Sequence, residues 1–96
     1  MTAKEGGERL GRELVDWSDL RTFYAVATAG SMNSAAELLG VTQSAISKRL
    51  GQLELRLGAR LLERSPTGIA LTEAGIEALD HVTTMMRASQ SLENTL

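Results

Sequence analysis

Glycines divide residues 17–58 into three short stretches, and each stretch repeats its apolar residues with the period of an α-helix. The first stretch follows Ser18, which can cap a helix, and ends at Gly30, because glycine is favoured just past a helix end. Its apolar residues recur at i, i+3, i+4 and i+7, at Leu20, Phe23, Tyr24 and Ala27. This spacing predicts an amphipathic helix with one face towards a core.

The second stretch, residues 31–40, predicts a short helix. Ser31, Asn33 and Ser34 are possible cap residues ahead of a run of Ala and Leu, and Gly40 ends the run. The next helix can start only two residues later, at Thr42, so the turn between the two helices must be tight.

The third stretch predicts a helix over residues 42–58. Its apolar stripe consists of Ile46, Leu50, Leu53 and Leu57. At 100° per residue, Ser44, Lys48 and Gly51 project opposite this stripe, with Ser47 on its shoulder. The outward face is therefore short and polar, apart from Leu55, which also points outward.

Turn residues and a long helical pattern follow Gly58. The sequence Ser-Pro-Thr-Gly at 65–68 lies between two apolar pairs, which predicts a two-stranded hairpin. Thr72 can then cap a last helix that extends towards Leu96. About 24 residues of helix would be about 36 Å long, more than a domain of this size can cover, so we expect the helix to need a partner.

Composition narrows the classes of function. The 96 residues, 43% of them apolar, fit one globular domain. With no cysteine, disulfides, a thiol nucleophile and cysteine-ligated zinc are excluded. The chain has no apolar run of the roughly 20 residues that a membrane span needs, and its start is too polar for a signal peptide, so we expect a cytoplasmic protein. The net charge is -2, yet residues 42–64 hold five basic and two acidic side chains, so positive charge is concentrated there.

Residues 17–96 resemble the amino-terminal domain of the bacterial LysR-type transcriptional regulators. The matching features, all at the family's spacing, are Ala35-Ala36, the run TQSAIS, Leu53-Glu54, Leu57-Gly58, LLER and LTEAG. The resemblance implies a mainly α fold, a winged helix-turn-helix with a three-helix core, a two-stranded β-hairpin wing and a long C-terminal dimerisation helix. It also implies a transcription factor that binds double-stranded DNA.

Together, pattern and resemblance divide the chain into three parts. We expect a flexible tail over 1–16, a DNA-binding domain over 17–72 and a linker and dimerisation helix over 73–96. Within the second part, the resemblance places the helix-turn-helix at 31–50 and the wing at 60–72. The family carries a larger effector-binding domain after the linker helix, and that domain is absent from this chain.

The start of the third helix supplies the candidate residues for reading DNA bases. Recognition in the major groove needs short donors and acceptors at the amino-terminal end of a helix. Thr42, Gln43, Ser44 and Ser47 meet this need. These four residues and Lys48 are called the reading face below. Gln43 can bond bidentately to adenine, and Lys48 can reach guanine or a phosphate. Alternatively, Thr42 and Gln43 only cap the helix and the two serines are solvated.

Two further pairs are candidates for backbone contacts. The resemblance places Asn33 and Ser34 at the phosphates, although both could also serve as helix caps. Arg64 and Thr67 lie in the hairpin, which by resemblance sits on the backbone or in the minor groove. An isolated arginine at a turn is more often simply solvated. Members of the family usually have proline at the position of Ser44 and arginine at the position of Lys48. These two differences bear on which operator sequence is recognised, and they leave the expected mode of docking unchanged.

The last helix carries a stripe that predicts a homodimer seam. Its members, spaced by three and four residues, are Ala78, Val82, Met85, Ser89, Leu92 and Leu96. The stripe could instead pack entirely on its own domain. A two-fold dimer would present two recognition helices about 34 Å apart, or a multiple of it, which fits a palindromic site.

Catalysis and cofactors find little support in the sequence. His81 lies beside Asp80 with no second histidine or cysteine for a metal, and no glycine-rich phosphate loop occurs. We therefore expect no enzyme activity, no metal and no cofactor. The remaining alternative is a winged-helix module that binds protein and not DNA, which the acidic composition and Leu55 favour slightly.

Overall fold

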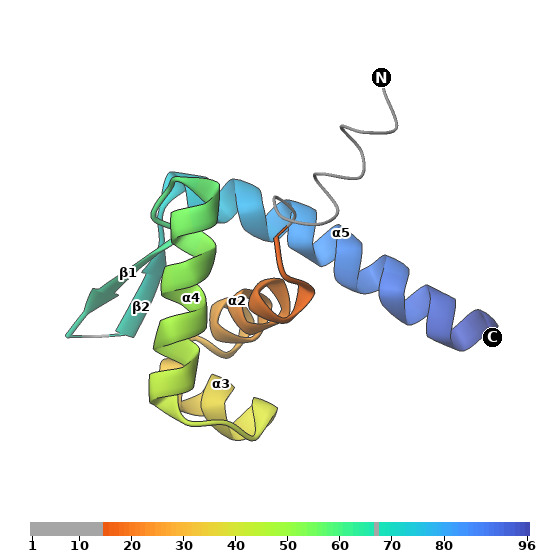
Figure 1. Ribbon diagram of the computed structural model, residues 1–96, viewed down its shortest axis with the longest axis horizontal. Coiled ribbons are helices and arrows are strands. Elements are labelled where there is room, and N and C mark those ends of the chain that lie inside the picture. Colours follow the sequence, from red (N-terminus) through yellow and green to blue (C-terminus); the bar gives the residue numbers. More distant parts are fainter. Residues whose placement is uncertain (1–14, 67) are drawn as a thin grey trace.

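The computed structural model describes residues 15–66 and 68–96, and it confirms a mainly α winged helix-turn-helix (Figure 1). The elements in chain order are α2 (Trp17–Ala29), α3 (Met32–Leu39), α4 (Gln43–Leu57), β1 (Leu62–Ser65), β2 (Gly68–Leu71) and α5 (Glu73–Thr95). The predicted tail over 1–16 lies almost wholly outside the described residues.

Helix α2 is central and packs against α3, α4 and α5. The core that it shares with them is aliphatic apart from Phe23, and its fully buried side chains are Phe23, Val26, Ala35, Ile46 and Leu53. The prediction that Ser18 caps α2 is wrong, because the cap lies two residues earlier and the helix begins at Trp17. Asp16 is the cap, and its carboxylate accepts a hydrogen bond from the Ser18 backbone N–H at 2.8 Å.

Helices α3 and α4 form the predicted tight helix-turn-helix. The hydroxyl of Ser31 caps α3 and that of Thr42 caps α4. Gly40 connects the helices with φ of 69°, in the left-handed region that glycine adopts without a steric penalty. The predicted helix end at Gly58 is also confirmed.

The apolar stripe of α4 is shorter than predicted. Ile46, Leu50 and Leu53 are buried, whereas Leu57, the fourth member of the predicted stripe, is 44% exposed. Leu57 is the last residue of α4. The outward orientation of Leu55 is confirmed by its 83% exposure.

The wing is an antiparallel hairpin in which Leu62 pairs with Leu71 and Ser65 with Gly68. Leu61 and Leu62 are buried at its base, while Glu63 and Arg64 on β1 are exposed. The two strands, Leu62–Ser65 and Gly68–Leu71, lie within the segment 60–72 that was predicted to form the wing. Thr67 lies outside the described residues.

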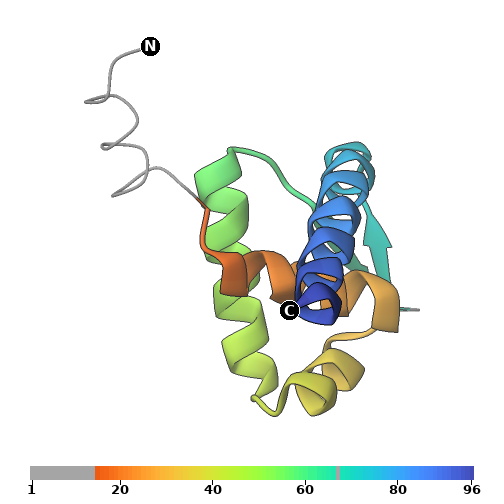
Figure 2. The ribbon, with the colours of Figure 1, turned by 90° about the vertical axis from the view of Figure 1, so that its right-hand side faces the viewer.

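Helix α5 begins on the domain and then projects away from it (Figures 1 and 2). Thr72 caps the helix as predicted, and its backbone N–H donates to the carbonyl of Leu61 at 3.0 Å. One turn later, Gly75 is buried against the same carbonyl. None of the helices in the described part of the chain has both the length and the hydrophobicity of a membrane span.

Candidate nucleic-acid interface

The reading face lies at the amino-terminal end of α4, as predicted. Thr42, Gln43, Ser44 and Lys48 are exposed, and Ser47 is half-buried. Thr42 also caps the helix, because its Oγ1 accepts a hydrogen bond from the Ala45 N–H at 3.1 Å. Capping and exposure therefore coexist in Thr42.

A hydrogen bond joins the two helices of the helix-turn-helix at their exposed ends. The side-chain Nε2 of Gln43 donates to Oδ1 of Asn33 at 3.0 Å. Ser34, the next residue of α3, is exposed, and its backbone N–H donates to the Ser31 hydroxyl at 3.0 Å. Asn33 thus contacts a residue of the reading face, whereas Ser34 takes part in the cap of α3.

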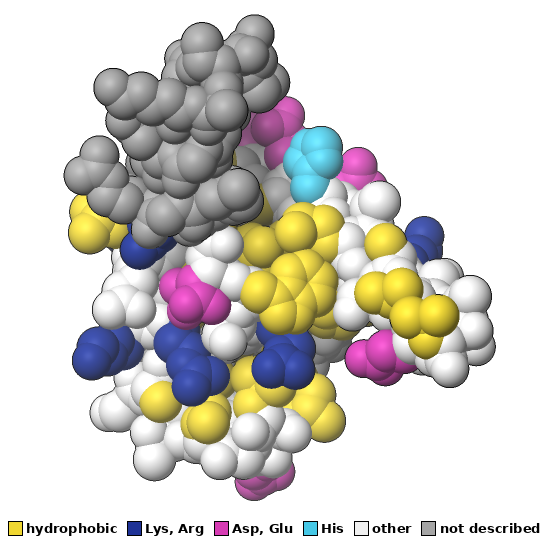
Figure 3. Space-filling model, turned by 45° about the vertical axis from the view of Figure 1, so that its right-hand side comes forward, with side chains coloured by type: hydrophobic (Ala, Val, Ile, Leu, Met, Phe, Trp, Pro, Cys, Tyr) yellow, Lys and Arg dark blue, Asp and Glu magenta, His cyan; other side chains and the backbone are white. Residues whose placement is uncertain are grey.

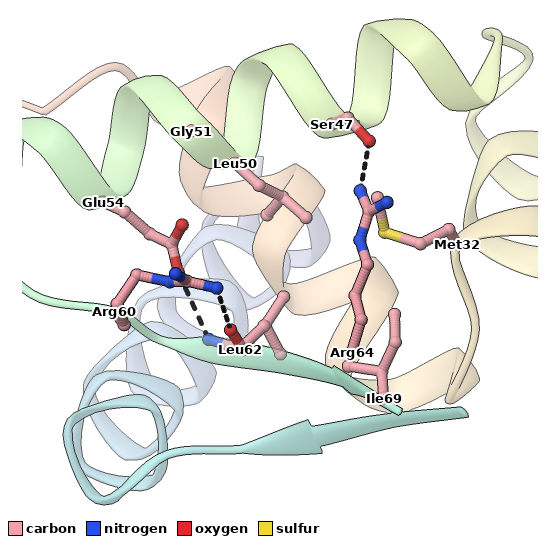
Figure 4. A pocket seen from close by; sticks show the side chains of 9 residues that line it. All are labelled: Met32, Ser47, Leu50, Gly51, Glu54, Arg60, Leu62, Arg64 and Ile69. Atoms are coloured by element: carbon pink, nitrogen blue, oxygen red, sulfur yellow. Dashed lines mark hydrogen bonds and ion pairs between the residues drawn. The ribbon is translucent and has the colours of Figure 1, made fainter. Parts of the chain in front are cut away.

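Arg64 connects the wing to α4. Its guanidinium extends from β1 towards the helix and donates a short hydrogen bond to the Ser47 hydroxyl (Figure 4). Arg64 is exposed, so this bond leaves its other N–H donors accessible to solvent. The predicted wing residue and a predicted base-reading residue therefore form one unit.

Glu54 has a positioning role that the sequence analysis did not predict, although Leu53-Glu54 is among the features that match the family. Its Oε2 accepts hydrogen bonds from the backbone N–H groups of Leu61, at 2.7 Å, and Leu62, at 3.3 Å. The same oxygen is 3.5 Å from Nε of Arg60, whose side chain also donates to the Leu62 carbonyl (Figure 4). Glu54 therefore fixes the start of β1 relative to α4. The signal in the sequence was an acidic residue within the most basic segment of the chain.

A hollow lies between α4 and the hairpin. Its walls include Met32, Leu50, Leu62 and Ile69. The polar pairs Ser47–Arg64 and Glu54–Arg60 also line it (Figure 4). Gly51 lines the hollow from α4, and a Cβ at this position would have no protein atom within 4 Å. The fold itself does not require glycine at 51.

The other cations of α4 lie near an acidic residue of α2. Asp19 is 7% exposed, and burial raises the pKa of its carboxyl, as does the charge of Asp16, while Arg49 and Arg56 lower it. The structure places Asp19 close enough to influence both, so part of their charge is balanced within the domain.

The predicted dimer seam divides into a covered and an open part. Val82 is only 3% exposed and packs in the core of its own domain, so its assignment to a dimer interface is wrong. Ala78 is half-buried and also packs against that core. Met85, Leu92 and Leu96 are 39%, 60% and 95% exposed, and Ser89 is half-buried. Figure 3 shows hydrophobic side chains along the projecting part of α5.

Comparison with known proteins identifies the family. The model of the bacterial regulatory helix-turn-helix proteins of the LysR family matches residues 17–76. The chain belongs to this family. BauR, a transcriptional activator of Pseudomonas aeruginosa, is 42% identical over 69 residues, or 72% of this chain and 23% of BauR. A regulator of Mycobacterium tuberculosis is 38% identical over 71 residues, or 74% of this chain and 23% of that protein.

Solved structures of LysR-family regulators share the fold. The DNA-binding domain of CbnR, crystallised in complex with DNA, has a TM-score of 0.75 and 40% identity, covering 83% of this chain and 93% of that domain. OxyR of Corynebacterium glutamicum has a TM-score of 0.80 and 30% identity, covering 85% of this chain and 26% of OxyR. This LysR-family chain thus spans about a quarter of the length of its curated relatives.

Proposed function

We propose that this LysR-family domain binds double-stranded DNA sequence-specifically and takes part in the regulation of transcription. The observation that carries the proposal is the exposed row of short polar side chains at the start of α4, with the wing attached beside it through Arg64 and Ser47. Helix α4 would enter the major groove and the wing would follow the backbone or the minor groove. The solved complex of the similar CbnR domain with DNA supports DNA binding by this domain.

We assign base contacts to Gln43, Ser44, Ser47 and Lys48 and backbone contacts to the remaining candidates. Thr42 stands at the helix start, where free backbone N–H groups also favour a phosphate. Asn33, Ser34, Arg64 and Thr67 would fix the position of the domain on the duplex without reading sequence. This is a function in binding, and none of these roles is catalytic.

We further propose a homodimer that forms through the projecting part of α5. Met85, Leu92 and Leu96 are large apolar side chains that the domain itself leaves exposed, and a second copy of α5 would bury them. Ser89 and Ala78 would lie at the same seam. The pair of α4 helices would then contact a palindromic site in the bacterial cytoplasm.

The proposal is tested by the fluorescence anisotropy of labelled duplexes at two salt concentrations. Binding should be saturable and should weaken with salt at a log-log slope of about -0.9 per neutralised phosphate. Lys48→Ala should lower affinity about 5- to 150-fold, mainly at one base pair, if Lys48 reads a base. Lack of saturable binding at either salt concentration would reject DNA binding. It would favour a protein-binding module, for which the exposed Leu55 offers an apolar contact.

A further inference from the structure

Asn33 and Gln43 are ten residues apart and belong to different helices, yet their carboxamides meet at the surface. The Nε2 of Gln43 lies 3.0 Å from Oδ1 of Asn33, within the normal range for an N–H···O hydrogen bond. Both residues are exposed, so the bond is not needed to satisfy buried polar groups. Gly40 and the cap at Thr42 fix the turn that brings the two side chains together.

The direction of this bond matters for what Gln43 can read. A carboxamide that contacts adenine bidentately must donate one N–H to N7 and accept from N6 through its oxygen. A free glutamine can rotate its amide by 180°, which exchanges donor and acceptor. When Nε2 is tied to Asn33, the nitrogen side faces α3, and Oε1 and one N–H are left for a base.

We propose that Asn33 is a positioning residue that holds the Gln43 carboxamide in one orientation for base discrimination. The inference rests on the proposed function, and it adds to the backbone contact assigned to Asn33. Its Oδ1 serves Gln43, and its Nδ2 still has two donors for a phosphate. Orienting a long side chain before binding also lowers the conformational entropy lost on binding.

The experiment uses the 96-residue chain with four single variants and one double variant. Selection from a random duplex library with the wild type defines the preferred site, and binding to all single base-pair changes of that site is then measured. The variants are Asn33→Ala, Gln43→Ala, their combination, Asn33→Asp and Ser34→Ala. Circular dichroism verifies the fold of each, which should persist because Ser31 still caps α3.

Gln43→Ala should remove discrimination at one base pair, which identifies the position that Gln43 reads. Asn33→Ala should reduce discrimination at that same base pair by about 2- to 10-fold, the range of one hydrogen bond. The double variant should discriminate no better and no worse than Gln43→Ala alone, because the effect of Asn33 passes through Gln43. Asn33→Asp retains the acceptor oxygen and should keep the discrimination, while its charge weakens binding to every duplex.

Ser34→Ala is the matched control, since Ser34 is exposed on the same turn of α3 and is assigned only to a phosphate. Ser34→Ala should lower the affinity for all duplexes by the same factor. The inference is overturned if Asn33→Ala behaves like Ser34→Ala, if Gln43→Ala changes discrimination at no base pair, or if the two single effects simply add. A wild type that enriches no sequence would overturn the proposed function itself, and the inference with it.

Discussion

Gly75 and Gly51 offer the same substitution, glycine to alanine within a helix, with opposite expected outcomes. Neither glycine has positive φ, so alanine meets no backbone strain at either position. A Cβ on Gly75 would lie 2.0 Å from the carbonyl oxygen of Leu61, whereas one on Gly51 would meet no protein atom within 4 Å. The difference between the two positions is therefore steric.

The size of the effect at Gly75 follows from this contact. Ordinary contact begins near 3.4 Å, so the start of α5 must move by about 1.4 Å relative to Leu61. Such overpacking costs about 1–3 kcal/mol. The displacement would also strain the bonds from Thr72 to Leu61 and Arg60, at about 1 kcal/mol for each one lost. Alanine recovers at most about 1 kcal/mol through its helix propensity. We expect Gly75→Ala to lower the free energy of unfolding by about 2 kcal/mol or more.

The measurement is thermal and urea unfolding followed by circular dichroism, at one chain concentration because dimerisation would raise the Tm with concentration. Gly75→Ala should lower the Tm by roughly 8–16 °C for a domain of this size. Gly51→Ala should raise the free energy of unfolding by about 0.5–1 kcal/mol. The steric reasoning is refuted if Gly75→Ala is as stable as the wild type, or if both variants shift in the same direction.

Three further predictions concern the wing, the buried acid and the dimer. Glu54→Ala should destabilise the domain by about 2 kcal/mol, because a charged acceptor of two backbone hydrogen bonds is lost. It should also speed hydrogen exchange of the backbone amides of residues 61 and 62, and Glu54→Gln should have an intermediate effect. Unchanged exchange would argue against the anchoring role of Glu54. Because the pKa of Asp19 is raised in the folded state, the folded state binds a proton at a higher pH than the unfolded chain does. Asp19→Asn should therefore be most stable relative to the wild type at neutral pH and lose this advantage in acid. Urea unfolding at several pH values measures the difference, and a difference that does not change with pH would contradict the prediction. Leu92→Asp should shift sedimentation towards the monomer and remove the dependence of the Tm on chain concentration, and a dimer that persists would exclude this seam.

Local signals in the sequence were sufficient for most of the fold. Helix ends depend on glycines and cap side chains within a few residues, so Gly30, Gly40 and Gly58 and the caps at Thr42 and Thr72 were predictable. Ser18 was a misleading cap because Asp16, two residues before it, can do the same. Both residues satisfy the pattern, and only the path of the chain decides between them.

The exposure of Leu57 and the error at Val82 have a different origin. Periodicity shows that a helix has an apolar face, but it does not show which neighbour covers each part of that face. On α4 the last buried member of the stripe is Leu53, and on α5 Val82 is buried in the core of its own domain. The pair contacts of the candidate site were equally hidden, since Asn33 and Gln43, or Ser47 and Arg64, meet only through the tertiary fold.

One face of α4 is turned towards the wing, and it includes Ser47 of the reading face. Ser47, Gly51 and Glu54 follow one another at intervals of four and three, so they lie on one face of the helix, and this face is turned towards the hairpin. Its two ends carry the bonds to Arg64 and to the start of β1, which join the wing to the helix at points about two turns apart. Two attachments prevent rotation of the hairpin about either one. The wing and the reading face should therefore meet a duplex as one rigid surface, and specificity would depend on Glu54 although it contacts no base.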